Sequence, residues 1–133
     1  MKNQFKLGII GCGFMATSIL KGLCESEFIR AKKIIVSDLD EAKLGAVKES
    51  FVVNVTGDNK FLAENCEFLL LAVKPQNFAE LSASLSGICP QKIISVMAGV
   101  KKAAIKNAFG VGLIKVARCM PNLPCANGCG MMA

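Results

Sequence analysis

Residues 11–16 have the types and spacing that bind phosphate groups. They read Gly-Cys-Gly-Phe-Met-Ala, the pattern G-x-G-x-x-A, between an apolar stretch and a segment of helical periodicity. In this pattern Gly11 allows a tight turn, and Gly13, which has no Cβ, lets the main chain approach a pyrophosphate. Ala16 is small enough for a helix to pack closely against a strand. The segment therefore predicts a dinucleotide site in which helix amides face the negative charge.

An acidic residue about 20 positions after such a pattern binds the adenosine ribose. Asp38 lies 22 positions after Ala16. The segment 38–41, Asp-Leu-Asp-Glu, also has the spacing of a helix capping box, so both interpretations of Asp38 stay open. A carboxylate here would repel a 2′-phosphate and no arginine adjoins it, which favours NAD(H). Ser37 and Lys43 leave room for NADP(H).

Three further loops follow apolar stretches that are predicted to be strands. They are Ala72-Val73-Lys74-Pro75, Ala98-Gly99-Val100 and Met120-Pro121-Asn122. Ligands of open parallel sheets bind at the carboxyl ends of the strands, so we expect these loops to converge on the glycine-rich segment. Two alternatives stay open within them. Lys74 could contact a phosphate or be solvated, and Gly99 could admit a flat ring or form a simple turn.

The periodicity of apolar residues predicts alternating strands and helices. Strands are expected at 6–10, 33–37, 52–55, 68–73, 92–96 and 112–117, and helices at 14–26, 40–49, 58–65, 75–85 and 101–109. Alternation of this kind predicts an α/β fold with a doubly wound, mostly parallel, Rossmann-like sheet in a three-layer αβα arrangement. The stretch 68–73 is the most apolar strand and is expected at the centre of the sheet.

The size and composition of the chain are those of one globular domain. Its 133 residues are 53% apolar, and the mean hydropathy of +0.47 excludes intrinsic disorder. The longest strictly apolar run, 68–73, is far shorter than the roughly 20 residues of a membrane span. The first residues have no signal-peptide or transit-peptide pattern, so a cytoplasmic protein is expected. The periodicity ends near Arg118, and segment 119–133 suggests that a neighbouring domain is missing.

Cysteine and histidine usage excludes several kinds of chemistry. The chain has seven cysteines, no Cys-x-x-Cys pair and no histidine, so we expect no metal site. The cysteines lie in apolar segments and are expected to be small buried side chains in a reducing compartment. The absence of histidine excludes Ser–His and Cys–His nucleophilic mechanisms.

The net charge of +6 is unevenly distributed along the chain. All ten acidic residues fall between Glu25 and Glu80, and six basic residues but no acidic ones follow Leu81. Nucleic-acid binding is disfavoured, because the chain has two arginines, no tyrosine, no tryptophan and no dense basic run. The remaining alternatives are a small anionic ligand and a solvated lysine face.

Six motifs, in order and with matching spacing, resemble one enzyme family. They are Gly-Cys-Gly-Phe-Met-Ala at 11–16, Val-Ser-Asp at 36–38, Asp-Asn at 58–59, Ala-Val-Lys-Pro at 72–75, Ser-Val-Met-Ala-Gly-Val at 95–100 and Arg-Cys-Met-Pro-Asn at 118–122. Together they resemble the N-terminal cofactor domain of the pyrroline-5-carboxylate reductases, over essentially all of the chain. That resemblance implies hydride transfer from the nicotinamide of NAD(P)H to the C=N carbon of pyrroline-5-carboxylate, giving L-proline.

The resemblance also implies a set of cofactor-binding residues. In chain order these are Gly11, Cys12, Gly13, Phe14, Met15, Ala16, Ser37, Asp38, Asn59, Ala72, Val73, Lys74, Pro75, Ala98, Gly99, Met120, Pro121 and Asn122. The first six surround the pyrophosphate, and the next three lie near the adenosine ribose. Residues 72–75 border the dinucleotide, and the last five line the nicotinamide pocket.

The chain departs from the family in sequence and in length. Segment 123–125 reads Leu-Pro-Cys where the family has Thr-Pro-Ala, and Met132 stands where a threonine is common, which affects the nicotinamide side. In the family a helical C-terminal domain forms an intertwined homodimer and completes the substrate site. That domain is absent here, so no catalytic residue is assigned. We expect the chain alone to bind cofactor weakly and to turn over little or nothing.

Two alternative functions stay open from the sequence. The chain could belong to another NAD(P)-dependent reductase that acts on a different imine or on a hydroxy acid. It could also be a non-catalytic nucleotide-binding or interaction module. Substrate preference would discriminate the first alternative, and tight association with an unrelated protein would favour the second.

Overall fold

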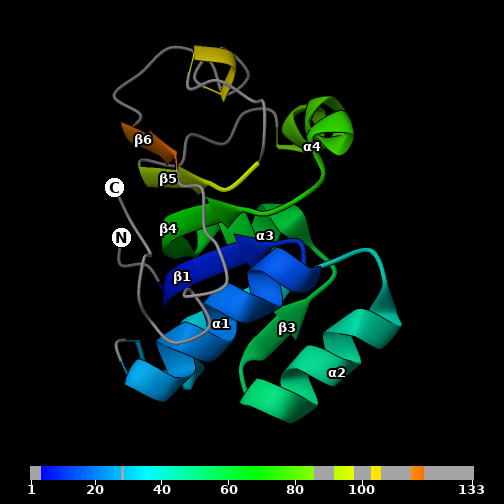
Figure 1. The fold of residues 1–133 in the computed structure, drawn as a ribbon. Helices are drawn as coiled ribbons and strands as arrows, with labels where there is room; N and C mark the ends of the chain where they lie inside the picture. The colour runs from blue at the N-terminus through cyan, green and yellow to red at the C-terminus, as the bar shows by residue number, and fades with distance from the viewer. Residues whose placement is uncertain (1–3, 28, 86–91, 98–102, 106–114, 119–133) are drawn as a thin grey trace.

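One six-stranded parallel sheet forms the framework of the structure. The computed structural model describes residues 4–27, 29–85, 92–97, 103–105 and 115–118, the last range by its backbone alone. The strands are β1 (Phe5–Ile10), β2 (Ile34–Ser37), β3 (Asn54–Thr56), β4 (Cys66–Leu71), β5 (Lys92–Ser95) and β6 (Lys115–Arg118). Their order is β3-β2-β1-β4-β5-β6, and each neighbouring pair is parallel (Figure 1). This is the doubly wound order, in which the direction of winding reverses between β1 and β4.

Short helices cover both faces of the sheet. They are α1 (Phe14–Ser26), α2 (Glu41–Phe51), α3 (Asn59–Glu64) and α4 (Phe78–Ser84), with 3-10 turns η1 (Ala31–Lys33) and η2 (Pro75–Asn77). Residues 103–105 are also helical. The helices α1 and α2 lie on one face and α3 on the other (Figure 1). Within the described ranges no helix is both long and apolar enough to span a bilayer.

The core consists of two apolar clusters, one on each face of the sheet. Successive residues of β4 illustrate the alternation: Leu70 packs in the cluster under α1 and α2, and Leu69 and Leu71 in the cluster under α3 and α4. All three are at most 3% exposed. Each buried leucine contributes about 1.5–3 kcal/mol of transfer free energy. The predicted α/β fold with three layers is therefore confirmed, and β4 occupies the central position that was expected of the most apolar strand.

Gly8 sets how closely α3 approaches β1. A Cβ atom at Gly8 would lie 2.5 Å from Leu62 Cδ2 and 2.8 Å from Cys66 Sγ. These atoms belong to α3 and to the first residue of β4, which pack against the strand at this point. Any larger side chain would require Leu62 and Cys66 to move.

Several predicted boundaries differ from the structure by two or three residues. β3 begins at Asn54 rather than at residue 52, because Val52 adopts a left-handed conformation that ends α2. β4 covers 66–71 rather than 68–73. The first turn of the helix predicted at 75–85 is a 3-10 turn, and the α-helix begins at Phe78. Parts of the predicted strand 112–117 and helix 101–109 lie outside the described residues.

Candidate dinucleotide-binding site

The glycine-rich turn joins β1 to α1 at the carboxyl edge of the sheet. Gly11 has a φ of 104°, a conformation that favours glycine, and a Cβ there would lie 2.8 Å from the carbonyl oxygen of Ala72. The Gly11 amide donates to the Ser37 carbonyl at 2.8 Å, and the Ala72 amide donates to the Ile10 carbonyl at 2.9 Å. The turn is therefore fixed between the ends of β2 and β4.

Gly13 is a glycine that the protein's own packing does not require. Its φ of −78° and ψ of −166° suit any residue. A Cβ built there would meet no atom of the described residues within 4 Å. Among the described residues, the space beside Gly13 is thus open at the start of α1, as a site for a pyrophosphate requires.

The start of α1 leaves its backbone amides available to an anion. Gly13 is the N-cap, so it can provide no side-chain cap, and the first turn of the helix holds no acidic residue. The first amides of a helix have no partner within the helix and carry a partial positive charge. Ala16 is 3% exposed and packs in the cluster beneath α1, which confirms the close helix–strand contact expected from its small size.

Asp38 binds the glycine-rich turn directly. Its Oδ2 accepts a hydrogen bond from the Cys12 amide at 2.9 Å, and its Oδ1 accepts from the Asp40 amide at 2.8 Å. The capping-box interpretation of Asp38 is wrong. Asp40 is the N-cap of α2, because its own carboxylate accepts from the amides of Ala42 and Lys43. Asp38 instead links the end of β2 to the turn after β1.

The two acidic groups of this turn have opposite pKa shifts. Burial raises the pKa of the Asp38 carboxyl, but the amides of Asp40 and Cys12 stabilise the carboxylate more strongly and leave its pKa below the ordinary value. Burial and the neighbouring Asp38 carboxylate raise the pKa of the Cys12 thiol to about 12. At neutral pH the site therefore holds an ionised Asp38 beside a neutral thiol, and Cys12 is no nucleophile.

Ser37 and Asn59, both predicted near the ribose, contact one another. Ser37 is fully buried, and its hydroxyl donates to the Oδ1 of Asn59. Asn59 is the first residue of α3, which Asp58 caps by accepting from the Phe61 amide at 3.1 Å. The side chain of Asn59 is thereby placed next to the end of β2.

The loop after β4 reaches the same edge of the sheet. Ala72 contacts the turn at Gly11, and Val73 packs partly against the cluster under α3 and α4. Lys74 is exposed, and Pro75 begins η2. The predicted residues Ala98, Gly99, Met120, Pro121 and Asn122 lie outside the described residues.

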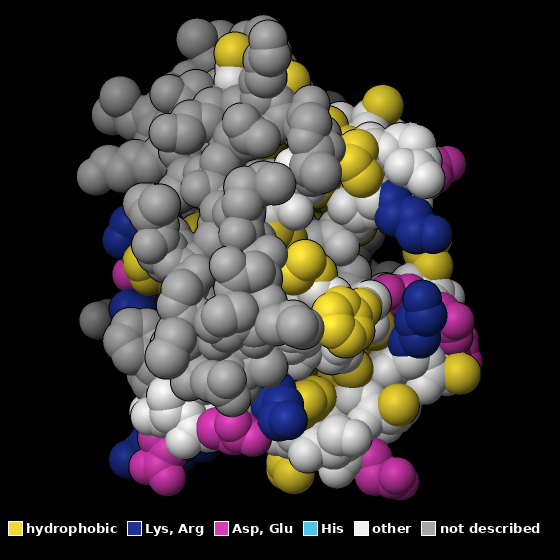
Figure 2. Space-filling model, viewed as in Figure 1, with side chains coloured by type: hydrophobic (Ala, Val, Ile, Leu, Met, Phe, Trp, Pro, Cys, Tyr) yellow, Lys and Arg dark blue, Asp and Glu magenta, His cyan; other side chains and the backbone are white. Residues whose placement is uncertain are grey.

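Two exposed apolar side chains flank this site. Leu39 is 90% exposed directly after Asp38, and Phe14 is 71% exposed directly after Gly13. On the face shown in Figure 2, hydrophobic side chains reach the surface among charged ones. Leu39 was not among the predicted site residues. The signal that could have identified it is its position, because it is an apolar residue between two aspartates at the start of a helix. Its exposed side chain offers an apolar surface to a ligand.

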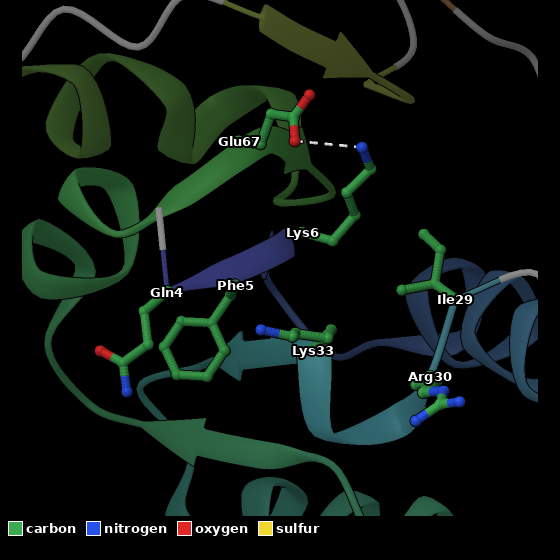
Figure 3. Close-up of a pocket in the computed structure, with 7 residues that line it drawn as sticks. All are labelled: Gln4, Phe5, Lys6, Ile29, Arg30, Lys33 and Glu67. Atoms are coloured by element: carbon green, nitrogen blue, oxygen red, sulfur yellow. Dashed lines mark hydrogen bonds and ion pairs between the residues drawn. The ribbon is translucent and has the colours of Figure 1, made fainter. Parts of the chain in front are cut away.

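A cavity of about 430 Å³ lies at the opposite, amino-terminal edge of the sheet (Figure 3). It is lined by residues within or directly before β1, η1 and β4, among them Phe5, Arg30 and Lys33. Lys6 points toward Glu67 there, with an Nζ–Oε1 distance of 3.0 Å (Figure 3). Ligands of doubly wound sheets bind at the carboxyl ends of the strands, so the glycine-rich edge is the candidate site.

Comparison with known proteins identifies the family of the chain. A model of the family described as NADP oxidoreductase, coenzyme F420-dependent, matches residues 6–99. A pyrroline-5-carboxylate reductase from Synechocystis is 39% identical, with 98% of this chain and 48% of that protein aligned. One from Methanosarcina acetivorans is 32% identical, with 92% of this chain and 46% of that protein aligned.

A solved structure confirms the resemblance at the level of the fold. The pyrroline-5-carboxylate reductase of Coxiella burnetii superposes with a TM-score of 0.78 at 32% identity, covering 93% of this chain and 46% of that one. The chain thus spans about half the length of the relatives it matches. It belongs to the family of NADP oxidoreductases that the family model describes, and it resembles the N-terminal half of the pyrroline-5-carboxylate reductases.

Proposed function

We propose that the chain is the dinucleotide-binding half of a pyrroline-5-carboxylate reductase, which reduces 1-pyrroline-5-carboxylate to L-proline with NADH or NADPH. The observation that carries the proposal is the open space at Gly13, because neither its backbone angles nor its neighbours account for a glycine there. A pyrophosphate in contact with the main chain does account for it. An enzyme of amino-acid synthesis would act in the cytoplasm, which is the location we propose.

The residues at the carboxyl edge fit a dinucleotide. Gly11 and Gly13 would let the pyrophosphate reach the amides at the start of α1, and Asp38 and Asn59 would bind the adenosine ribose. Lys74 would lie along the phosphates, since it is exposed at the same edge. When bound, the nicotinamide supplies the hydride for the imine carbon. The chain's own task is to hold the dinucleotide in a fixed orientation.

The nicotinamide and substrate sides of the site rest on the resemblance. Ala98, Gly99, Met120, Pro121 and Asn122 are proposed to line the nicotinamide pocket. The substrate site would be completed by groups from the other half of the relatives' chains. In the family, that half includes a helical domain that forms a homodimer. This chain by itself would then show little or no turnover.

Titration of the chain with NADH and NADPH tests the proposal, because a ligand that binds the folded state raises the unfolding temperature with concentration. Gly13→Val is expected to abolish binding, since its side chain occupies the space of the pyrophosphate. Gly45→Val is the matched control: Gly45 lies in α2, and a Cβ there also meets no described atom within 4 Å. Unchanged affinity of the Gly13 variant, or equal loss in both variants, would contradict the proposed site.

A further inference from the structure

We propose that Ser37 is a positioning residue, whose hydroxyl orients the amide of Asn59 so that the amide nitrogen donates to the 2′-hydroxyl of the adenosine ribose. The inference rests on the proposed function, because it assumes that a dinucleotide binds at this edge. It adds a role for Ser37, which would act on the ribose through the side chain of Asn59. The contact of Asn59 with the ribose belongs to the proposed function.

The first step concerns the burial of Ser37. It ends β2 in the interior of the sheet, paired with Ile10 of β1 and Thr56 of β3, and its exposure is 0%. A buried hydroxyl needs an acceptor for its proton, since an unpaired one costs free energy. The acceptor in the structure is the Oδ1 of Asn59. Ser37 therefore depends on the amide oxygen at this position.

The second step concerns the two possible orientations of the Asn59 amide. With Oδ1 facing Ser37, the nitrogen Nδ2 remains on the outer side of the amide group. Rotating the amide by 180° would place the donor Nδ2 against the hydroxyl and break the hydrogen bond that Ser37 donates to Oδ1. Burial of Ser37 thus selects the orientation in which Asn59 offers donors to a ligand.

The third step concerns the partner of that donor. Asp38 follows Ser37 directly. Each of its carboxylate oxygens accepts one backbone amide, and the carboxylate also accepts from the Cys12 thiol, which leaves one lone pair for a ligand. The end of β2 therefore presents an ionised acceptor next to an amide donor. A hydroxyl group can donate to the first and accept from the second. A phosphate dianion only accepts, so it satisfies Asn59 and is repelled by Asp38.

The test compares the affinities of the chain for NADH and 2′-deoxy-NADH, followed by nicotinamide fluorescence. The chain contains no tryptophan or tyrosine that would interfere. In the unmodified chain, loss of the 2′-hydroxyl is expected to weaken binding about tenfold, as the removal of a charge-assisted hydrogen bond does. In Ser37→Ala this ratio is expected to fall to about threefold, while the Kd for 2′-deoxy-NADH changes less than about twofold.

A second variant keeps the test decisive if Ser37→Ala does not fold. Asn59→Asp retains an oxygen for the Ser37 hydroxyl but replaces the donor nitrogen with an acceptor, so the ratio is expected to fall in the same way. Lys60→Gln is its control, because it makes the same change in net charge at the next, exposed residue of α3. The control is expected to keep the ratio of the unmodified chain.

The outcomes separate this inference from the proposed function. If the unmodified chain binds neither compound, the dinucleotide site itself is wrong. If it binds both, but the ratio stays unchanged in Ser37→Ala or Asn59→Asp, Ser37 does not act through Asn59. Equal weakening of both compounds would likewise assign Ser37 a purely structural role and overturn the inference.

Discussion

Asp38 combines two roles in one side chain. Its oxygens hold the amides of Cys12 and Asp40, and these bonds fix the carboxylate in place and keep it ionised. A fixed negative charge at the end of β2 opposes a 2′-phosphate, whereas a ribose hydroxyl can donate to it. We therefore expect Asp38 to influence the choice between NADH and NADPH.

Replacing Asp38 with serine is expected to shift the preference toward NADPH. Removal of the repelling charge should lower the ratio of the Kd for NADPH to the Kd for NADH about tenfold at low salt. Both constants can be measured by fluorescence titration. Asp40→Ser is the matched control, since it removes a carboxylate two residues away while serine still caps α2. A ratio that moves equally in both variants would show that Asp38 does not face the 2′ position.

The sequence predicts that Ser37, Asp38 and Asn59 lie in one site, but not which hydrogen bonds they form. The spacing from Ala16 identifies Asp38, and the resemblance adds Ser37 and Asn59. The bond from Ser37 to Asn59 and the bond from Cys12 to Asp38 join residues 22 and 26 positions apart. Such contacts depend on how β1, β2 and α3 are placed by packing, which no local pattern specifies.

At the scale of the elements, the end of α2 shows where local propensity fails. Val52 adopts φ 57°, ψ 38°, and its amide bonds the Lys48 carbonyl at 2.9 Å to close the helix. Glycine is usual at such a position, because a Cβ is strained in the left-handed region. A β-branched residue predicts a strand instead, so the expected strand began at residue 52. In contrast, α1 has the predicted bounds, because its apolar spacing and the glycine at position 13 both indicate a helix that begins at Phe14.

Val52→Gly is expected to stabilise the chain by about 1 kcal/mol, because the relief of strain exceeds the entropic cost of the glycine. Little burial is lost, since Val52 is 75% exposed. The free energy of unfolding in urea measures the change. Val53→Gly is the control: Val53 is 3% exposed, so its loss is expected to destabilise the core. Destabilisation by Val52→Gly would mean that the left-handed cap is not strained.

At the scale of the whole molecule, the two edges of the sheet carry different kinds of groups. The carboxyl edge holds the glycine-rich turn, Asp38 and Asn59. At the amino edge, Glu67 of β4 pairs with Lys6 of β1 at 3.0 Å and with Lys92 of β5 at 3.2 Å. Hydrogen bonds from these two lysines hold the pKa of the Glu67 carboxyl below its ordinary value. Ion pairs join the strands at that edge, whereas the opposite edge holds the proposed ligand site.

Acid is expected to destabilise the chain through these carboxylates. The folded-state pKa values of Asp38 and Glu67 are lowered, so their contribution is present above the ordinary values of 3.8 and 4.5. It is lost as the pH falls through the folded-state values. Asp38→Asn should flatten the fall in unfolding free energy between about pH 5 and pH 2. Urea titrations at several pH values measure the free energy of unfolding, and Glu64→Gln, at an exposed residue, is the control. An identical dependence of the unfolding free energy on pH in Asp38→Asn and in the unmodified chain would contradict the prediction.

The contact of Gly11 with the Ala72 carbonyl couples two loops that are 61 positions apart. The Ala72 amide also bonds the Ile10 carbonyl at 2.9 Å, so the two loops are held in direct contact. The rim of the proposed nucleotide site is thus built from two pieces of chain that pack against each other. Substitutions at residues 72–75 must therefore preserve the backbone path at Gly11, whichever side chains are exchanged.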